Sequence, residues 1–103
     1  MNRNEKPAKF TTKNFKTWQQ KMLFYLTMLN MAKFLKDDPP IFREDEEDTI
    51  TSFNIAEAWN NSNFLCRNYI LNSLSDELYD VYSIKKRAEE LWELLDHKYK
   101  RNS

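Results

Sequence analysis

Residues with catalytic or metal-binding side chains are few in this sequence of 103 residues. The only histidine, His97, follows Asp96, and the only cysteine is Cys66. A metal site or an active site needs several such groups together, and the sequence supplies no second histidine and no pair of cysteines. We therefore predict a surface histidine, no metal site, no catalytic residue, no cofactor and no enzymatic activity.

The remaining reactive groups also favour structural roles. Cys66 falls on the apolar side of a predicted helix, where a free cysteine packs as a small hydrophobic residue. The acidic run Asp45-Glu46-Glu47-Asp48 lacks the alternating ligands and the glycine of a calcium-binding loop. The sequence contains no glycine, which argues against phosphate-binding loops and favours helices joined by polar connections.

The composition predicts a small folded domain inside the cell. Hydrophobic residues make up 41% of the sequence and aromatic residues 15%, whereas disordered chains are poor in aromatic residues. A single cysteine cannot form an internal disulfide, which favours the reducing cytoplasm, with the nucleus as an open alternative. No apolar run approaches the roughly 20 residues that span a bilayer, and the N-terminus lacks the apolar core of a signal peptide, so we expect no membrane association.

The first half of the sequence predicts one helix, a short helical piece and a loop. Asn14 is a favourable N-cap residue, so a helix is expected to follow it. A short helical piece is expected at residues 31–35. Pro39-Pro40 then interrupts helical structure within a loop over residues 36–49, because proline cannot continue a helix. The apolar stripe of the first helix, with spacings of three and four residues, is Phe15, Trp18, Met22, Leu26 and Leu29, widened by Leu23 and Tyr25.

Three further helices are expected after this loop. A long helix should run from about Ser52 to about Ser73. A short helix over residues 76–82 has Ser75 as its N-cap, and a last helix has Ser83 as its N-cap. No segment alternates with the period of a strand, so the prediction is an all-α bundle of four to five helices. The inward face of the long helix is Ile55, Ala58, Trp59, Ser62, Cys66, Tyr69, Ile70, Ser73 and Leu74, and that of the last helix is Ala88, Leu91, Trp92, Leu95 and Tyr99.

The net charge is zero, but the charges are segregated along the sequence. Residues 1–36 carry eight Lys/Arg and one acid, Glu5, whereas residues 37–57 carry eight Asp/Glu and one base, Arg43. Two regions of opposite sign can steer a partner or support head-to-tail self-association. The alternative is that both regions are solvated surfaces without a function.

The segment 10–26 combines lysines with five aromatic side chains. Most of the aromatic side chains lie on the stripe that a helix needs in order to pack into a core, which favours a core helix. The alternatives are a helix that docks on a partner protein and a platform on which nucleic-acid bases stack. Few aromatic side chains remain for stacking, so we expect direct nucleic-acid binding to be weak or absent.

The stripes define the expected core and leave a second set of apolar residues for an interface. We expect a flexible arm at residues 1–9, a helical domain at residues 10–100 and a tail at residues 101–103. The expected core anchors are Phe15, Trp18, Met22, Leu26, Trp59, Tyr69, Ile70, Leu91, Trp92 and Leu95. The candidate interface, taken from positions off the stripes or in connections, is Phe24, Met28, Ile41, Phe42, Phe53, Phe64 and Tyr82.

An ordered pattern of residues also extends over about residues 9–100. It comprises Phe10, Asn14-Phe15, Trp18, Met22, Leu26, an acidic loop with prolines, Ala58-Trp59, Asn68-Tyr69-Ile70, Leu74, Ala88-Glu89-Glu90-Leu91-Trp92, Leu95 and Lys98-Tyr99. This pattern resembles the start of the Gag polyprotein of plant copia-type LTR retrotransposons. Thr12 departs from it, because the family commonly has glycine there, which puts the turn before the first helix in question.

The resemblance implies the N-terminal lobe of a helical capsid protein. In the family this lobe is followed by a C-terminal lobe and a zinc knuckle that binds RNA. The chain would then be either an excised lobe of a longer Gag or a truncated, domesticated derivative.

Together these observations lead us to expect a capsid-like module that works through protein–protein contacts. It would form a homodimer or weak oligomer, or co-assemble with Gag-like subunits. One alternative is a domesticated adaptor or inhibitor that binds a host protein. The other is a basic nucleic-acid chaperone.

Overall fold

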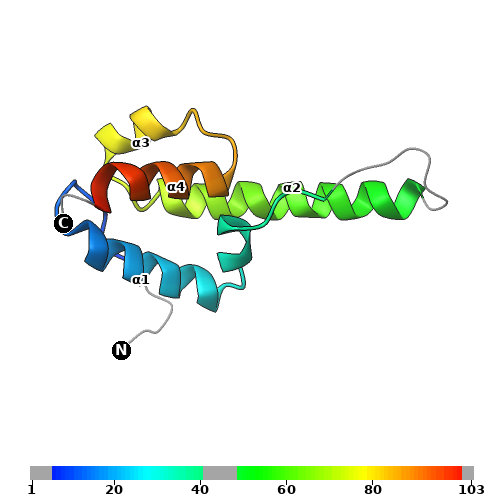
Figure 1. Cartoon of the computed structure of the whole chain (residues 1–103), viewed down its shortest axis with the longest axis horizontal. Helices are drawn as coiled ribbons and strands as arrows, with labels where there is room; N and C mark the ends of the chain where they lie inside the picture. The colour runs from blue at the N-terminus through cyan, green and yellow to red at the C-terminus, as the bar shows by residue number, and fades with distance from the viewer. Residues whose placement is uncertain (1–5, 41–48, 101–103) are drawn as a thin grey trace.

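The computed structural model describes residues 6–40 and 49–100 (Figure 1). Within these ranges the chain forms α1 (Phe15–Met28), the 3-10 helix η1 (Ala32–Leu35), α2 (Thr49–Leu71), α3 (Asp76–Tyr82) and α4 (Ala88–Tyr99). The same ranges contain no strand, and Phe10 and Leu74 form only an isolated parallel bridge. The predicted all-α fold is therefore confirmed.

The long helix α2 runs along the molecule and carries the other elements at one of its ends (Figure 1). α4 and η1 contact α2 and each other, and α1 contacts η1. The N-terminal half of α2 extends beyond all of them (Figure 1). The radius of gyration is accordingly 15.5 Å, against about 13 Å for a globular domain of this length. The molecule is thus a helical bundle with one projecting helix.

A cluster of aromatic rings joins the segment before α1 to α1 itself and to α4. The centroid of the Phe10 ring lies 5.3 Å from that of Trp18 and 5.0 Å from that of Tyr99. The indole N–H of Trp18 donates a hydrogen bond to the carbonyl of Ser73 (3.1 Å), and the backbone N–H of Phe10 donates to the same carbonyl (2.8 Å). These contacts fasten α1 to the chain that leaves α2.

The ten expected core anchors all lie in or against one hydrophobic cluster. Seven are buried: Phe15, Trp18, Met22, Leu26, Ile70, Leu91 and Leu95. The other three, Trp59, Tyr69 and Trp92, are only partly buried and pack against the cluster from its edge. Trp59, for example, sets its ring edge-to-face against Phe34 at 5.7 Å. The core also includes apolar residues that the stripe analysis left out of the anchors, chiefly Phe10, Tyr25, Phe34, Leu35, Leu71, Leu74 and Leu78.

Non-glycine residues occupy the left-handed backbone positions at both ends of α1. Thr12 (φ 80°), Asn14 (φ 58°) and Asn30 (φ 61°) all have positive φ. Asn14 is the N-cap as predicted, but its side chain makes no capping hydrogen bond. At the C-terminus, Asn30 N–H bonds the Thr27 carbonyl and Met31 N–H bonds the Leu26 carbonyl, which is the Schellman pattern that usually uses glycine. Thr12 thus has a backbone conformation that glycine adopts more readily than other residues.

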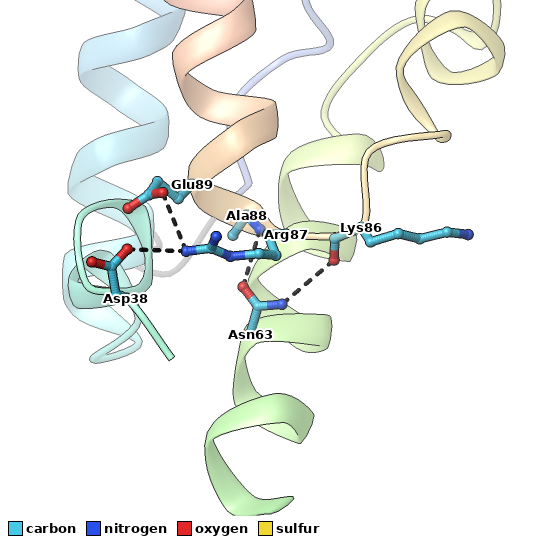
Figure 2. A network of polar contacts seen from close by, with 6 residues as sticks. All are labelled: Asp38, Asn63, Lys86, Arg87, Ala88 and Glu89. Atoms are coloured by element: carbon cyan, nitrogen blue, oxygen red, sulfur yellow. Dashed lines mark hydrogen bonds and ion pairs between the residues drawn. The ribbon is translucent and has the colours of Figure 1, made fainter. Parts of the chain in front are cut away.

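The start of α4 differs from the sequence prediction. Ser83 is not its N-cap but the C-cap of α3, and α4 begins at Ala88 after Arg87, whose side chain does not cap it. The first helical N–H instead donates to the side chain of Asn63 on α2 (Ala88 N to Asn63 Oδ1, 3.0 Å) (Figure 2). The cap of α4 therefore comes from a different helix, which a local pattern cannot show.

Asn63 belongs to a polar network that holds the connection between α3 and α4 (Figure 2). Its amide nitrogen donates to the carbonyl of Lys86 (3.5 Å). One turn along α2, the guanidinium of Arg67 donates to the carbonyls of Ser83 (2.6 Å) and Lys85 (2.5 Å). Two side chains of α2 thus bond three carbonyls of this connection and the first N–H of α4, and they fix where α4 begins.

Other boundaries lie close to the predicted ones. Ser75 caps α3 as expected, and its side chain accepts a hydrogen bond from Leu78 N–H (3.5 Å). α2 begins at Thr49 and ends at Leu71, slightly before both predicted ends.

Candidate interaction surface

The two residues that could have taken part in catalysis are placed in structural settings. Cys66 is fully buried, and its thiol lies 3.5 Å from the carbonyl oxygen of Met31, to which it donates. Burial raises the pKa of the Cys66 thiol from 9.0 to about 12, so the thiol stays protonated and is a poor nucleophile. His97 is exposed on α4. Its neighbour Asp96 already accepts a hydrogen bond from the Gln19 amide (2.8 Å) and pairs with Lys100 (3.7 Å).

Residues 6–40 and 49–100 contain neither a metal-binding cluster nor a membrane-spanning helix. No group of three or more His, Cys, Asp or Glu side chains there is arranged to hold a metal ion. None of the helices there has the length and apolar character needed to cross a bilayer. The features that remain to be explained are exposed apolar side chains.

Four residues of the candidate interface are exposed, one is not, and two lie outside the described residues. Phe24, Met28, Phe53 and Phe64 are exposed. Ile41 and Phe42 lie in the part of the chain that the structure does not describe. The sequence analysis missed further exposed apolar residues: Leu23, Ile50, Ile55, Leu65, Val81 and Ile84.

The assignment of Tyr82 to the interface was wrong. Only 5% of Tyr82 is exposed, and its hydroxyl donates to the hydroxyl of Tyr99 (3.4 Å). Burial, reinforced by this hydrogen bond, raises the pKa of Tyr82 above its ordinary value. Tyr82 lies four residues after Leu78, which is also buried; this helical spacing was the signal that could have placed both in the core.

The first half of α2 exposes apolar side chains on two sides. Ile50 is 75% exposed, and Ile55, which was predicted to face the core, is 55% exposed. The spacing of 11 residues places Ile55 on the same side of the helix as Cys66, but the other elements pack near the C-terminal end of α2 (Figure 1), and Ile55 is exposed. On the other side, Ile50, Phe53, Glu57 and Phe64 are spaced by three, four and seven residues and are all exposed. We call these four residues the α2 patch.

α1 presents a second exposed stripe on the side away from the core. Lys21, Phe24 and Met28 are spaced by three and four residues and are all exposed, Phe24 by 60%. α1 contains two lysines and no acidic residue. We call Lys21, Phe24 and Met28 the α1 patch. The α1 patch combines apolar surface with the positive charge of Lys21, whereas the only charged residue in the α2 patch is the acid Glu57.

A shallow groove of about 300 Å³ lies between α1 and α4. Gln20 and Leu23 line it on α1, and Trp92, Glu93 and Lys100 line it on α4. Gln19 and Asp96 also line the groove, and the amide of Gln19 donates a hydrogen bond to the carboxylate of Asp96. The groove holds no cluster of groups that could carry a reaction, and we regard the α1 and α2 patches as the stronger candidate surface.

No protein family, curated protein or solved structure matches this chain.

Proposed function

We propose that this chain is a non-enzymatic protein–protein interaction module of the capsid type, which associates with copies of itself or with similar subunits. The observation that carries the proposal is the projecting half of α2, where Ile50 and Ile55 are exposed on opposite sides of one helix. A helix that extends from its own bundle with apolar side chains uncovered is typical of a surface completed by another protein.

The resemblance of the ordered residue pattern to Gag proteins supports self-association over other kinds of binding. A capsid lobe works by repetition, and a repeated contact needs two complementary surfaces on one chain. The α1 and α2 patches meet this requirement, because both are apolar and they carry opposite charge. Exposed charge pairs contribute only about 0–1 kcal/mol each, so the apolar side chains must supply most of the affinity. We expect an affinity in the micromolar range, about −8 kcal/mol.

The burial of the N-terminal aromatic residues argues against the nucleic-acid alternative. Phe10, Phe15 and Trp18 are buried, so they cannot stack on bases without unfolding α1. A single-stranded nucleic-acid platform needs exposed rings beside its basic groups, and Phe24 is the only ring of α1 that is exposed.

Sedimentation of the full chain from low micromolar to near-millimolar concentration tests the proposal. We expect the mean mass to rise with concentration without any added partner. Ile50→Lys should weaken this association by at least tenfold, as expected for loss of an interface residue worth more than about 1.4 kcal/mol. Ile84→Lys is the matched control, since Ile84 is 70% exposed but lies outside both patches, and it should associate like the wild type.

A strictly monomeric protein over the whole concentration range would overturn self-association. The exposed half of α2 would then favour the alternative of an adaptor that binds a host protein. Salt-sensitive binding of random RNA by a monomer would instead favour the chaperone alternative.

A further inference from the structure

We infer that copies of this chain join head to tail, with the α1 patch of one copy lying antiparallel on the α2 patch of the next. This inference rests on the proposed self-association and specifies its geometry. The occupant of each patch is therefore a second copy of the chain, and the contact uses two different surfaces.

The order of side chains in the two patches favours antiparallel pairing. Along α1 the order is Lys21, Phe24, Met28, and along α2 it is Ile50, Phe53, Glu57. In each series the first and last residues are seven positions apart, or about 10.5 Å of helix at 1.5 Å per residue. Antiparallel alignment places Lys21 opposite Glu57 and the four apolar side chains opposite one another. Parallel alignment would place Lys21 opposite Ile50 and Glu57 opposite Met28, leaving both charges against apolar partners, which is unfavourable.

Charge also distinguishes this contact from a contact between two α2 helices. Glu57 is the only charged residue in the part of α2 from Thr49 to Cys66. Two α2 patches packed together would bring two Glu57 side chains into the same apolar interface, where like charges repel. The α1 patch instead offers Lys21, and α1 carries no acid to oppose Glu57.

The directions of α1 and α2 determine how successive copies are oriented in this contact, which does not close on itself between two copies. Figure 1 shows α1 and α2 running in opposite directions, with α1 and the projecting half of α2 at opposite ends of the molecule. A second copy in about the same orientation therefore has its α1 antiparallel to the α2 of the first. The surfaces that meet are different, so the contact is heterologous and leaves one free patch at each end. Further copies can then add at both ends.

Two blocked variants test this geometry in the full chain. Phe24→Glu places a negative charge in the α1 patch, and Ile50→Lys places a positive charge in the α2 patch. Each variant keeps one intact patch. We expect each alone to lose self-association by at least tenfold, while an equimolar mixture forms a one-to-one complex that grows no further. Circular dichroism checks that both exposed substitutions leave the helices intact, and Ile84→Lys is again the control.

A charge exchange gives an independent measurement. Lys21→Glu and Glu57→Lys should each weaken association, and the double variant K21E/E57K should recover most of the wild-type affinity, because it restores the opposite-charge pair. Recovery by the double variant cannot result from a merely structural role of either residue.

The outcomes separate this inference from the proposed function. If the wild type associates and the blocked variants associate equally well, the patches are not the interface, and the proposed function stands without this geometry. If the blocked variants are monomeric and their mixture is also monomeric, the contact is not heterologous. If the wild type is monomeric throughout, both the inference and the proposed self-association are wrong.

Discussion

The two halves of α2 belong to one continuous helix but have opposite surroundings. In the C-terminal half, Asn63, Cys66, Ile70 and Leu71 are buried, and side chains of this half hold the connection to α4. In the N-terminal half, the large apolar side chains on both sides of the helix are exposed, apart from Trp59, which packs at the edge of the core. Helical spacing therefore identifies a face of a helix, but it does not identify what covers that face. The C-terminal half contributes one face to the core, with Phe64 and Leu65 exposed beside it, whereas the N-terminal half leaves most of its large apolar side chains exposed.

The largest expected effect comes from truncating equivalent isoleucines in the two halves. Ile70→Ala should lower the free energy of unfolding by about 2–5 kcal/mol, since Ile70 is fully buried and its loss leaves a cavity. Ile55→Ala should change it by no more than about 0.5 kcal/mol, as for other exposed positions. Denaturant unfolding at low protein concentration, where no association contributes, measures both. Equal effects would show that the two halves are covered to the same extent.

Two asparagines on α2 allow the loss of a buried tertiary hydrogen bond to be compared with the loss of an exposed side chain. Asn63→Ala should cost about 1–3 kcal/mol, because it leaves the Ala88 N–H without its acceptor in a buried setting. Asn61→Ala is the control, since Asn61 is exposed, and it should be neutral or slightly stabilising. The chemical unfolding midpoints of the two variants give the comparison. A neutral Asn63→Ala would mean that the start of α4 does not depend on α2.

Cys66, in the C-terminal half of α2, should also make the free energy of unfolding depend on pH in the alkaline range. The pKa of Cys66 is raised from 9.0 to about 12 by burial, so folding favours the protonated thiol. This contribution is complete below about pH 9 and is lost as the pH rises from 9 towards 12, by about 1.4 kcal/mol per pH unit for one group. Unfolding free energies measured at about pH 8 and pH 10 should therefore differ more in the wild type than in Cys66→Ala. An identical difference in both proteins would exclude Cys66 as a source of the pH dependence.

The smallest expected effect is a change in amide hydrogen exchange in the N-terminal half of α2. Asn60 is exposed on α2, and alanine has a helix propensity about 0.5–0.7 kcal/mol more favourable than that of asparagine. Asn60→Ala should slow amide hydrogen exchange locally in the first turns of α2, because the helix there depends on intrinsic propensity more than on packing. Exchange in α4 should not change. Uniform slowing over the whole chain would show that the projecting half unfolds together with the bundle.

Local signals in the sequence were sufficient to predict most of the helices. The stripe after Asn14 predicted α1, and Ser75 with two following acids predicted α3 and its cap. The start of α4 was not predictable in this way, because its first N–H is capped by Asn63, 25 residues earlier in the chain. Ser83 satisfies the same local preference for a cap, but it is used at the end of α3.

The candidate surface was predictable in part. Phe24, Met28 and Phe64 were correctly left out of the core stripes, because their helical spacing excludes them from those faces. Ile55 was predicted to be buried and Tyr82 to be exposed, and both predictions were wrong. Ile55 has the spacing of a core residue but lies beyond the end of the bundle, and Tyr82 lies on a short helix whose inward face is set by its packing on Tyr99. The error at Ile55 concerns how far the bundle reaches along α2, which depends on the tertiary arrangement, whereas the spacing of Tyr82 from the buried Leu78 was a local signal of its burial.

The attachment of Trp18 to Ser73 has a consequence for the synthesis of the protein. These residues are 55 positions apart in the chain. At a synthesis rate of about 5–20 residues per second, Ser73 is made roughly 3–11 seconds after Trp18. Throughout that interval the indole N–H of Trp18 lacks its acceptor from the end of α2, although α1 is the first helix to be synthesised. The N-terminal helix is therefore complete well before it can be attached to the end of α2.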